Sequence, residues 1–504
     1  MATHYLERIL RAHVYDVARE TPVDPARTLS RRLGHEVLIK REDLQPVFSF
    51  KLRGAYNKIS HLSDAQRAGG VICASAGNHA QGVALSAKTL GIRATIVMPK
   101  TTPDIKVQAV RELGGKVVLQ GDAFDESLAH ALQLAEKEGM TFVHPYDDPD
   151  VIAGQGTIGL EILRQLKGRL DTIFLPVGGG GLAAGVATLI KSVRPEIRVV
   201  AVEPDDAACL QAALAAGKRV SLAEVGLFAD GVAVKQIGKE TFSLLRKHVD
   251  EVVTVSSDEI CAAIKDIFED TRAIAEPAGA VALAGLKKWA GARTEKNLSL
   301  LAVLSGANIN FDRLRHVSER AELGERREAV LAVTLPEQPG AFRAFCQALG
   351  RRGITEFNYR YNDSQTAAVF AGVQIQDQAE LTQLIAQLND KGYDVLDMTD
   401  NEIAKLHVRH LVGGHAPRDA GDERIFRVEF PERPGALLKF LSVLGKSFNI
   451  SLFHYRNHGA DHGRVLVGFQ VGKGEEKALR DLLTQLPYPC VEETNNPACR
   501  LFLR

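Results

Sequence analysis

Short apolar runs alternate with longer helical patterns through the first 320 residues of the chain. One series of expected strands reads GGVICASAG, RATIVMPK and KVVLQG, and helical patterns over 80–90 and 105–113 separate them. A second series passes from a strand over 172–177 through a helix over 182–193 to the segment IRVVAVEP. Continuous Val, Ile and Leu strands between helices are typical of parallel sheets that helices cover on both faces. We therefore predict an α/β fold with two sheet-bearing lobes and a ligand cleft between them.

The pattern changes after about residue 310. The stretch 313–327 (RLRHVSERAELGERR) is charged and helical in period, and two similar segments follow it. The first reads AVLAVTLPEQPGAFRAFCQALGRRGITEFNYRY, and the second reads RIFRVEFPERPGALLKFLSVLGKSFNISLFHYR. Gly340 aligns with Gly435 at an offset of 95 (435 − 340). Internal repetition on this scale indicates two copies of one folding unit.

Each copy contains an expected strand, a Pro-Gly turn, an amphipathic helix and a second strand with alternating aromatic residues. The aromatic pairs are Phe357 with Tyr359 and Phe453 with Tyr455, which align at an offset of 96 (453 − 357). Such a unit resembles the ACT-like modules that bind amino-acid effectors in regulated biosynthetic enzymes. The alternative is that the repeat only mediates assembly.

The length of 504 residues favours about three domains. We assign residues 1–320 to the α/β domain and 321–328 to a neck. Residues 329–398 and 423–494 form the two expected α+β modules.

Composition and charge narrow the class of protein. The apolar share is 45% and the charged share 25%, values that are typical of a soluble globular protein. Lys plus Arg and Asp plus Glu both number 62, so the formal net charge is zero, whereas nucleic-acid-binding domains usually carry a basic surplus. No apolar run approaches the roughly 18 residues of a membrane span, and the charged N-terminus does not resemble a signal peptide. We expect a cytoplasmic protein that binds neither nucleic acid nor a membrane.

Three segments of the α/β domain could carry chemistry. In REDLQPVFSFKLRGAYNK, Lys51 lies between apolar and aromatic neighbours just before a helical run. Apolar surroundings disfavour the charged form of an amine, which is what a Schiff-base lysine requires. Taken alone, a lysine at such a position is more often a solvated surface residue.

The second segment is ASAGNHAQG, at the junction of an expected strand and helix. Small residues there free the backbone N–H groups of a helix N-terminus for a carboxylate, and Ser75, Asn78 and His79 add side-chain donors. An ordinary strand-to-helix turn with an Asn cap is the plain alternative.

The third segment is LPVGGGGLAAG, in which Gly178–Gly181 follow an expected strand and open the next helix. Four glycines let the chain approach a phosphate closely with its backbone N–H groups. The segment also fits the start of a dinucleotide fingerprint, GxGxxA, with Glu203 at the end of the next strand. Context disfavours that alternative, because the loop follows a complete earlier lobe and no second nucleotide-binding half is recognisable.

In combination, these segments resemble the pyridoxal-phosphate enzymes of the tryptophan-synthase-β-like fold and, within them, the biosynthetic threonine dehydratases. The segments SFKLRGA, SAGNHAQG, GGGGLAAG and LSGAN match that family in order and spacing. With the two ACT-like modules, the resemblance covers almost the whole chain.

The resemblance implies a role for each matching residue. Lys51 would hold pyridoxal 5'-phosphate as a Schiff base and act as the catalytic base. Asn78 would hydrogen-bond the ring hydroxyl, Ser305 would face the pyridine nitrogen, and Gly231 would pass near the ring. The phosphate would be held by Gly178, Gly179, Gly180, Gly181 and Leu182. The substrate carboxylate would be bound by Ser75 and by the backbone of Gly77, Asn78 and His79.

The chemistry that the resemblance implies is β-elimination. A serine is a poor proton source for a pyridine nitrogen, so with Ser305 the ring would draw less charge from the Cα carbanion. That favours prompt loss of a β-substituent over transamination. Removal of the Cα proton by Lys51, loss of the β-hydroxyl and hydrolysis of the resulting imine would give a 2-oxo acid and ammonia. For L-threonine the products would be 2-oxobutanoate and ammonia.

Two positions depart from the related serine racemases. Those enzymes carry a second serine where this chain has Ala76, which has no proton to exchange, so racemisation is disfavoured. They also bind a divalent ion through a Glu followed six residues later by an Asp, and here Cys209 stands at that offset from Glu203. The six cysteines show neither CxxC pairing nor metal-ligand spacing. We therefore predict no metal site.

We expect a threonine dehydratase at the first step of isoleucine synthesis, with L-threonine, or L-serine, as substrate. The resemblance implies isoleucine as the inhibitor and valine as an opposing effector. Such regulation requires an effector that binds two states unequally, and the two modules offer a second site far from Lys51. The candidate effector-lining residues are Phe357, Tyr359, Phe453 and Tyr455, for which ordinary core aromatics are the alternative. Pairing of modules between subunits would give a homotetramer.

Two other hypotheses stay open at this point. One is a lyase for L-serine or another β-substituted amino acid, with the same lysine chemistry. The other is an amino-acid sensor whose enzyme lobe is inactive.

Overall fold

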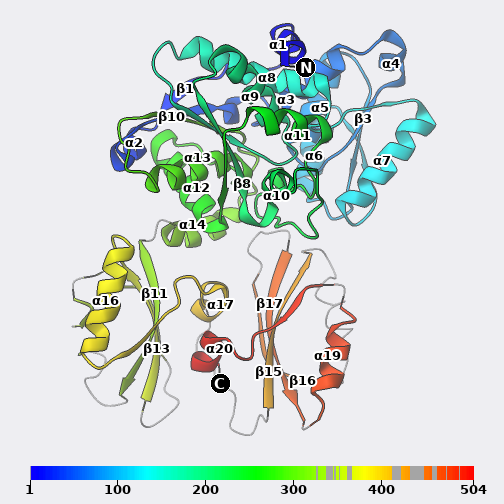
Figure 1. Cartoon of the computed structure of the whole chain (residues 1–504). Coiled ribbons are helices and arrows are strands. Elements are labelled where there is room, and N and C mark those ends of the chain that lie inside the picture. The colour runs from blue at the N-terminus through cyan, green and yellow to red at the C-terminus, as the bar shows by residue number, and fades with distance from the viewer. Residues whose placement is uncertain are drawn as a thin grey trace. The chain divides into compact units, whose positions relative to one another are not determined.

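The computed structural model describes residues 2–324, 327–336, 344–345, 348–350, 352, 354–359, 366–410, 422–431, 448–456, 462–472, 474–486 and 488–503. The chain divides into two compact units, Met1–Phe311 and Asp312–Arg504 (Figure 1). The turn glycines Gly340 and Gly435 of the repeat lie outside the described residues.

The larger sheet of the first unit has the strand order β1-β2-β10-β7-β8-β9, and every neighbouring pair except β1 with β2 is parallel. Its strands are β1 (Val23–Pro25), β2 (Glu36–Arg41), β7 (Thr172–Pro176), β8 (Arg198–Pro204), β9 (Glu251–Val255) and β10 (Ser299–Leu304). Ile173 and Leu175 belong to one buried cluster, whereas the ring of Phe174 lies 5.5 Å from that of Trp289. Alternate residues of β7 are thus buried on opposite faces of the sheet, which is why the whole strand is apolar.

The smaller sheet has the order β5-β4-β3-β6, and all of its pairs are parallel. Its strands are β3 (Val71–Ala74), β4 (Ala94–Met98), β5 (Lys116–Leu119) and β6 (Thr141–Phe142). Cys73 packs into a cluster with Val83, whereas its neighbour Ile72 packs into another with Ala131. The predicted α/β fold with two parallel sheets is confirmed, with the antiparallel edge strand β1 as an addition.

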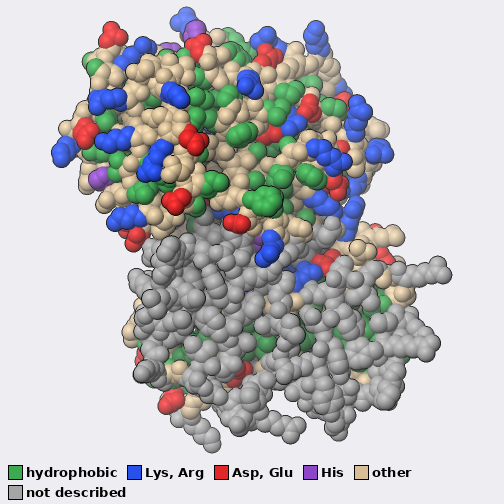
Figure 2. Space-filling model, turned by 180° about the vertical axis from the view of Figure 1, so that it is seen from behind, with side chains coloured by type: hydrophobic (Ala, Val, Ile, Leu, Met, Phe, Trp, Pro, Cys, Tyr) green, Lys and Arg blue, Asp and Glu red, His purple; other side chains and the backbone are tan. Residues whose placement is uncertain are grey.

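Helices cover both sheets (Figure 1). They are α1 (Ala2–Leu10), α2 (Arg27–Leu33), α3 (Lys51–Ser60), α4 (Asp64–Gly69), α5 (Asn78–Thr89), α6 (Asp104–Glu112), α7 (Phe124–Glu138), α8 (Pro149–Gln165), α9 (Gly181–Val193), α10 (Cys209–Ala216), α11 (Lys239–His248), α12 (Ser257–Thr271) and α13 (Pro277–Gly291). The helices expected over 80–90, 105–113 and 182–193 are α5, α6 and α9. On the face shown in Figure 2, acidic and basic side chains of this unit are interspersed. None of the described helices has both the length and the apolar character to cross a membrane.

Helices α3 and α8 cross so closely that glycine is required on both. A Cβ on Gly54 would lie 2.7 Å from the carbonyl oxygen of Val151, and a Cβ on Gly154 would lie 2.7 Å from that of Arg53. Without side chains at these two positions, the backbones of the two helices come into contact. This contact holds the first turn of α3, which begins at Lys51, against α8.

The second unit contains two antiparallel sheets of the same topology, with orders β12-β13-β11-β14 and β16-β17-β15-β18. Their strands are β11 (Glu328–Pro336), β12 (Ile354–Tyr359), β13 (Thr366–Gln374), β14 (Asp394–Asp397), β15 (Asp422–Pro431), β16 (Asn449–Arg456), β17 (His462–Val471) and β18 (Cys490–Glu492). Pro336 pairs with Thr366, and Pro431 pairs with His462. The equivalent positions are 95 (431 − 336) and 96 (462 − 366) residues apart, which confirms the repeat.

The helices that the structure describes in the second unit are α14 (Arg313–Gly324), α16 (Gln378–Asp390), α17 (Glu402–Leu406), α19 (Glu476–Leu483) and α20 (Pro497–Phe502). The repeat is also seen at Thr399 and Thr494, which are equivalent residues near the ends of the two modules. Thr399 Oγ1 accepts a hydrogen bond from the Val330 N–H at 3.1 Å, and Thr494 Oγ1 accepts one from the Ile425 N–H at 3.0 Å. Side chains of both copies then share one buried cluster, which includes Val330, Phe370, Ile403, Ile425, Leu466 and Cys499.

Candidate active site

A pocket lies where strands of both sheets in the first unit end. The segments that follow β3, β6, β7 and β10 all contribute to it, because the carboxyl ends of parallel strands meet at one edge of a sheet. Its lining residues are Phe50, Lys51, Asn78, Pro145, Tyr146, Pro176, Gly178, Gly179, Gly180, Gly181, Leu182, Gly231, Val232, Glu276, Ala278 and Ser305. All eight residues expected to hold the cofactor are among them, as is Gly231.

Lys51 is the first residue of α3, and its half-buried side chain lines the pocket. Burial lowers the pKa of this amine to about 8, and the nearby Glu276 carboxylate opposes the shift. The Nζ atom lies 5.7 Å from the centroid of the Phe50 ring. An amine with this pKa is partly neutral near pH 7, as a nucleophile or a general base must be.

The glycine loop Gly178–Gly181 connects the end of β7 to the start of α9. Gly180 has a φ of 92°, in the left-handed region that favours glycine. A Cβ on Gly179 would lie 2.2 Å from ring atoms of Tyr146, so a larger residue does not fit. The loop therefore brings bare backbone and the N-terminus of α9 to the pocket wall, an arrangement that suits a phosphate group.

Asn78, the first residue of α5, has both ends of its amide engaged. Its Nδ2 donates to Glu276 Oε1 at 2.6 Å, and its Oδ1 accepts from Asn308 Nδ2 at 2.6 Å. Glu276 is 5% exposed and lines the pocket, and the sequence pattern did not reveal it. An acidic residue before a Pro-Ala-Gly helix start is common at the beginning of helices and does not by itself point to a site.

Ser305 and Gly231 meet the start of α13 from two sides. Ser305 follows β10, is 4% exposed, and donates its hydroxyl proton to the Ala278 carbonyl oxygen over a long 3.4 Å. A Cβ on Gly231 would lie 2.8 Å from the Cβ of Ala278. Both residues therefore stand at the pocket wall in close contact with α13.

The loop expected to bind a carboxylate is only partly at the pocket. Asn78 lines it, whereas Ser75, Gly77 and His79, which the structure also describes, are outside the lining. Ser75 Oγ accepts from the Gly77 N–H at 3.2 Å. The His79 Nε2 lies 2.8 Å from the Val143 carbonyl oxygen, so this nitrogen carries a proton and donates it. Burial and the Lys51 charge lower the pKa of His79 to about 3, so the ring stays neutral near pH 7.

Glu203 binds the start of α10. Its carboxylate accepts from the backbone N–H groups of Leu210 and Gln211 at 2.8 and 2.9 Å. Burial raises the pKa of Glu203 to about 7, although these hydrogen bonds oppose the shift. Cys209, six residues later, donates its thiol proton to the Gly178 carbonyl oxygen at 3.4 Å. In the described part of the chain, no three His, Cys, Asp or Glu side chains are grouped so that they could hold a metal ion.

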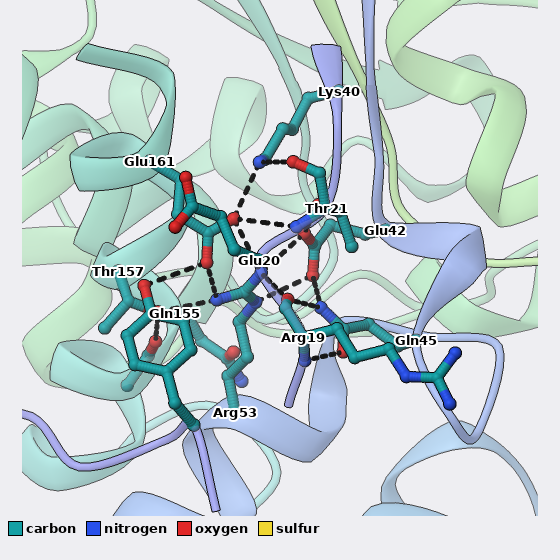
Figure 3. Close-up of polar contacts among 12 residues, drawn as sticks. Arg19, Glu20, Thr21, Lys40, Glu42, Gln45, Arg53, Gln155, Thr157 and Glu161 are labelled. Carbon is teal, nitrogen blue, oxygen red and sulfur yellow. Dashed lines mark hydrogen bonds and ion pairs between the residues drawn. The ribbon is translucent and has the colours of Figure 1, made fainter. Parts of the chain in front are cut away.

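A buried charge network begins at Arg53, two residues after Lys51 (Figure 3). Arg53 is 0% exposed and pairs with Glu42 at 2.8 Å and with Glu161 at 2.5 Å. Lys40, equally buried, pairs with Glu161 at 2.6 Å. Burial opposes the charged forms, but the ion pairs raise the pKa of Arg53 and lower the pKa of Glu42. The network therefore joins α3, α8 and the end of β2 through two cations and two carboxylates.

Residues 14–306 match the family model for pyridoxal-phosphate dependent enzymes, and residues 319–408 and 414–503 both match the C-terminal regulatory domain of threonine dehydratase. Over an alignment of 507 residues that covers all of both proteins, the chain is 57% identical to the biosynthetic L-threonine dehydratase IlvA of Burkholderia multivorans. This chain belongs to the biosynthetic threonine dehydratases. It is 56% identical to the Escherichia coli enzyme of that name, over 99% of this chain and 97% of that protein.

Among solved structures, the processed form of threonine deaminase isoform 2 from Solanum lycopersicum is 52% identical, with a TM-score of 0.63. The match covers 64% of this chain and 88% of that chain. The resemblance stated from the sequence motifs is thereby confirmed, and pyridoxal phosphate is the cofactor of the family. The pocket fits this group, because a crowded glycine loop and an amine of lowered pKa stand in its wall.

The candidate effector residues of this dehydratase lie on equivalent strands. Phe357 of β12 pairs with Ala371, and Phe453 of β16 pairs with Val467, at the same register in both modules. The strands also contain Tyr359 and Tyr455. The side chains of these four aromatics lie outside the described part of the structure.

Proposed function

We propose that this enzyme converts L-threonine to 2-oxobutanoate and ammonia by eliminating the β-hydroxyl group. The proposal is carried by the Lys51 amine, with its pKa lowered to about 8, in a pocket that the Gly178–Gly181 loop also lines. The 57% identity to a biosynthetic L-threonine dehydratase along the whole chain supports L-threonine as the substrate.

The pocket residues would divide between holding the cofactor and moving the proton. The backbone of Gly178–Gly181 and the first turn of α9 would bind the phosphate, Asn78 would donate to the ring hydroxyl, and Ser305 would stand at the pyridine nitrogen. When bound, pyridoxal phosphate withdraws electrons from the Cα atom of an amino acid joined to its aldehyde carbon. The Lys51 amine would accept the Cα proton at Nζ, since a useful fraction of it is neutral near pH 7.

The start of α5 would hold the substrate carboxylate. The N–H groups of its first turn, which begins at Asn78, lie at the positive end of the helix. The Ser75 oxygen accepts from Gly77, which leaves the hydroxyl proton to donate to the substrate. The His79 ring donates to Val143, so His79 would contribute through its backbone.

Elimination is favoured over racemisation by the residue before Gly77. Racemisation needs a second acid-base group that returns a proton to the opposite face of Cα. Ala76 carries no such group. Lys51 would therefore be the residue that moves the Cα proton, and the reaction would proceed to loss of the β-hydroxyl.

We further propose that isoleucine inhibits the enzyme through the two C-terminal modules, that valine opposes it, and that four chains form a homotetramer. Both modules match the regulatory domain of threonine dehydratase, which supports an effector role. Their shared apolar cluster supports coupling, because binding at one module then alters the packing of the other. In this proposal, the reaction is the first step of isoleucine synthesis, and isoleucine is the end product that inhibits it. The cytoplasmic location expected from the sequence stays a prediction.

The test measures 2-oxo acid release from L-threonine by the full-length holoenzyme, with and without isoleucine. We expect turnover that falls sigmoidally with isoleucine and a Lys51→Ala variant without turnover. Turnover indifferent to isoleucine would leave the lyase and remove the feedback role. If the protein binds the cofactor but does not turn over L-threonine, the next step is to compare kcat/KM for L-serine and other β-substituted amino acids. A purified protein that takes up no cofactor would favour the sensor hypothesis.

A further inference from the structure

A chain of hydrogen bonds reaches the Asn78 amide from outside the pocket. The carbonyl oxygen of Val47 accepts from Asn308 Nδ2 at 2.8 Å, and the same Nδ2 donates to Asn78 Oδ1 at 2.6 Å. Asn78 Nδ2 then donates to Glu276 Oε1 at 2.6 Å. The four residues come from segments that precede α3, follow β10, begin α5 and precede α13, so the tertiary fold alone brings them together.

The groups at the two ends of this series of hydrogen bonds, the Val47 carbonyl and the Glu276 carboxylate, set the direction of each bond in it. A main-chain carbonyl only accepts, so the Asn308 group beside Val47 is the NH2, and this NH2 also faces Asn78 Oδ1. An ionised carboxylate also only accepts, so Glu276 requires the NH2 of Asn78. If the Asn78 amide were rotated by 180°, its oxygen would face the Glu276 carboxylate and its NH2 would face the Asn308 NH2, so both hydrogen bonds would be lost.

The position of Glu276 is prepared by its neighbours. It is the N-cap residue of α13, with Pro277 next, so its carboxylate lies at the positive end of a helix. A Cβ on Gly306 would lie 2.3 Å from Glu276 Oε1. The glycine of the LSGAN motif therefore makes the room that the carboxylate needs in order to reach Asn78.

We propose that Glu276 and Asn308 are positioning residues that present an N–H group of Asn78, and not its carbonyl oxygen, to the pocket. The Asn78 NH2 has two protons, and Glu276 accepts one of them. The second proton suits an anionic acceptor, and the ring hydroxyl oxygen of pyridoxal phosphate is of that kind. This inference rests on the assignment of Asn78 to the ring hydroxyl in the proposed function.

The test follows the visible absorption band of bound pyridoxal phosphate in the full-length protein, which requires no turnover. Glu276→Ala removes the acceptor that holds the amide. A hydrogen-bond donor stabilises the anionic ring oxygen. Loss of the donor should therefore raise the pH midpoint of the band change by about one unit, and it should raise the cofactor dissociation constant roughly tenfold. Asn308→Ala should shift both in the same direction. Glu276→Gln retains an acceptor oxygen and should restore both toward the wild-type values.

Asp266→Ala is the matched control, because it removes a buried carboxylate of α12 that pairs with Arg32 at 2.5 Å and with Lys287, outside the pocket lining. An unshifted band in Glu276→Ala, or in Asn308→Ala if the first variant does not fold, would overturn the proposal. A Glu276→Gln band shifted as far as that of Glu276→Ala would also overturn it, because the shift would then come from loss of the negative charge and not from loss of the acceptor. Shifted bands in these variants together with a wild type inactive on L-threonine would sustain this inference and refute the proposed substrate.

Discussion

Asn401 and Asn496 are joined by a hydrogen bond between their side chains, Nδ2 to Oδ1 at 3.2 Å, although they belong to different copies of the repeat. Each also caps a helix of its own copy. Asn401 Oδ1 accepts from the Ala404 N–H at 3.1 Å, and Asn496 Oδ1 accepts from the Ala498 N–H at 2.9 Å. Equivalent residues thus meet each other, as in an interface between two symmetric subunits.

We expect Asn401→Ala to loosen both copies. The substitution removes the cap of α17, which typically costs about 1 kcal/mol, and also the bond to the residue that caps α20. Amide hydrogen exchange should therefore become faster in α20 as well as in α17. Asn389→Ala, at an exposed position of α16, is the control and should change neither. Faster exchange confined to α17 would show that this pair does not couple the modules.

The lowered pKa of Lys51 predicts how cofactor uptake depends on pH. The neutral amine attacks the aldehyde, so with a pKa of about 8 the rate should rise through pH 8 and level off above it. At pH 7.5 about a quarter of the amine would be neutral, against about one part in a thousand for an ordinary lysine. Stopped-flow absorbance of apoenzyme mixed with pyridoxal phosphate measures this rate. A midpoint near pH 10 would contradict the burial argument.

Arg53→Ala should destabilise the first unit strongly. It leaves Glu42 and Glu161 buried with one cation, Lys40, and breaking a buried pair typically costs about 3 to 5 kcal/mol. Trp289 is the single tryptophan of the chain and lies in this unit, so its fluorescence during urea unfolding reports the change. Arg11→Ala breaks the exposed pair with Glu7 and should change the unfolding midpoint little. If Arg53→Ala and Arg11→Ala lowered the unfolding midpoint equally, the buried ion pairs of Arg53 would not be the stabilising feature.

Gly179→Ala should weaken cofactor binding. The added Cβ would overlap the Tyr146 ring at 2.2 Å, and relief of such overpacking typically costs about 1 to 3 kcal/mol. Because both residues line the pocket, the strain should appear as a cofactor dissociation constant raised roughly tenfold or more. Gly168→Ala, where a Cβ meets nothing within 4 Å, is the control. Titration of the apoenzymes with pyridoxal phosphate compares the two.

Much of the site was accessible from local pattern. Lys51, Asn78 and the glycine loop each stand where an expected strand or helix begins or ends, whereas Ser305 was named only through the family resemblance. The structure brings all of them to one pocket. The carboxyl ends of parallel strands meet at one edge of a sheet, which explains why these segments converge, but their shared site was expected from the family resemblance. The chemical role of each residue stays a prediction. His79 shows a limit of that approach. We expected its side chain to be a donor in the site, but the ring N–H donates to the Val143 carbonyl oxygen.

The sequence by itself determined the two parallel sheets, the repeat and the motif residues, because periodicity and spacing are local properties of the chain. Only the tertiary structure decided which polar side chains meet. Glu276 lies 198 residues from Asn78, and Glu161 lies 108 residues from Arg53, yet each pair is in contact. Whether a Glu or Arg is a solvated surface residue or a buried partner depends on how distant helices and strands pack, and no local pattern of residues records that packing.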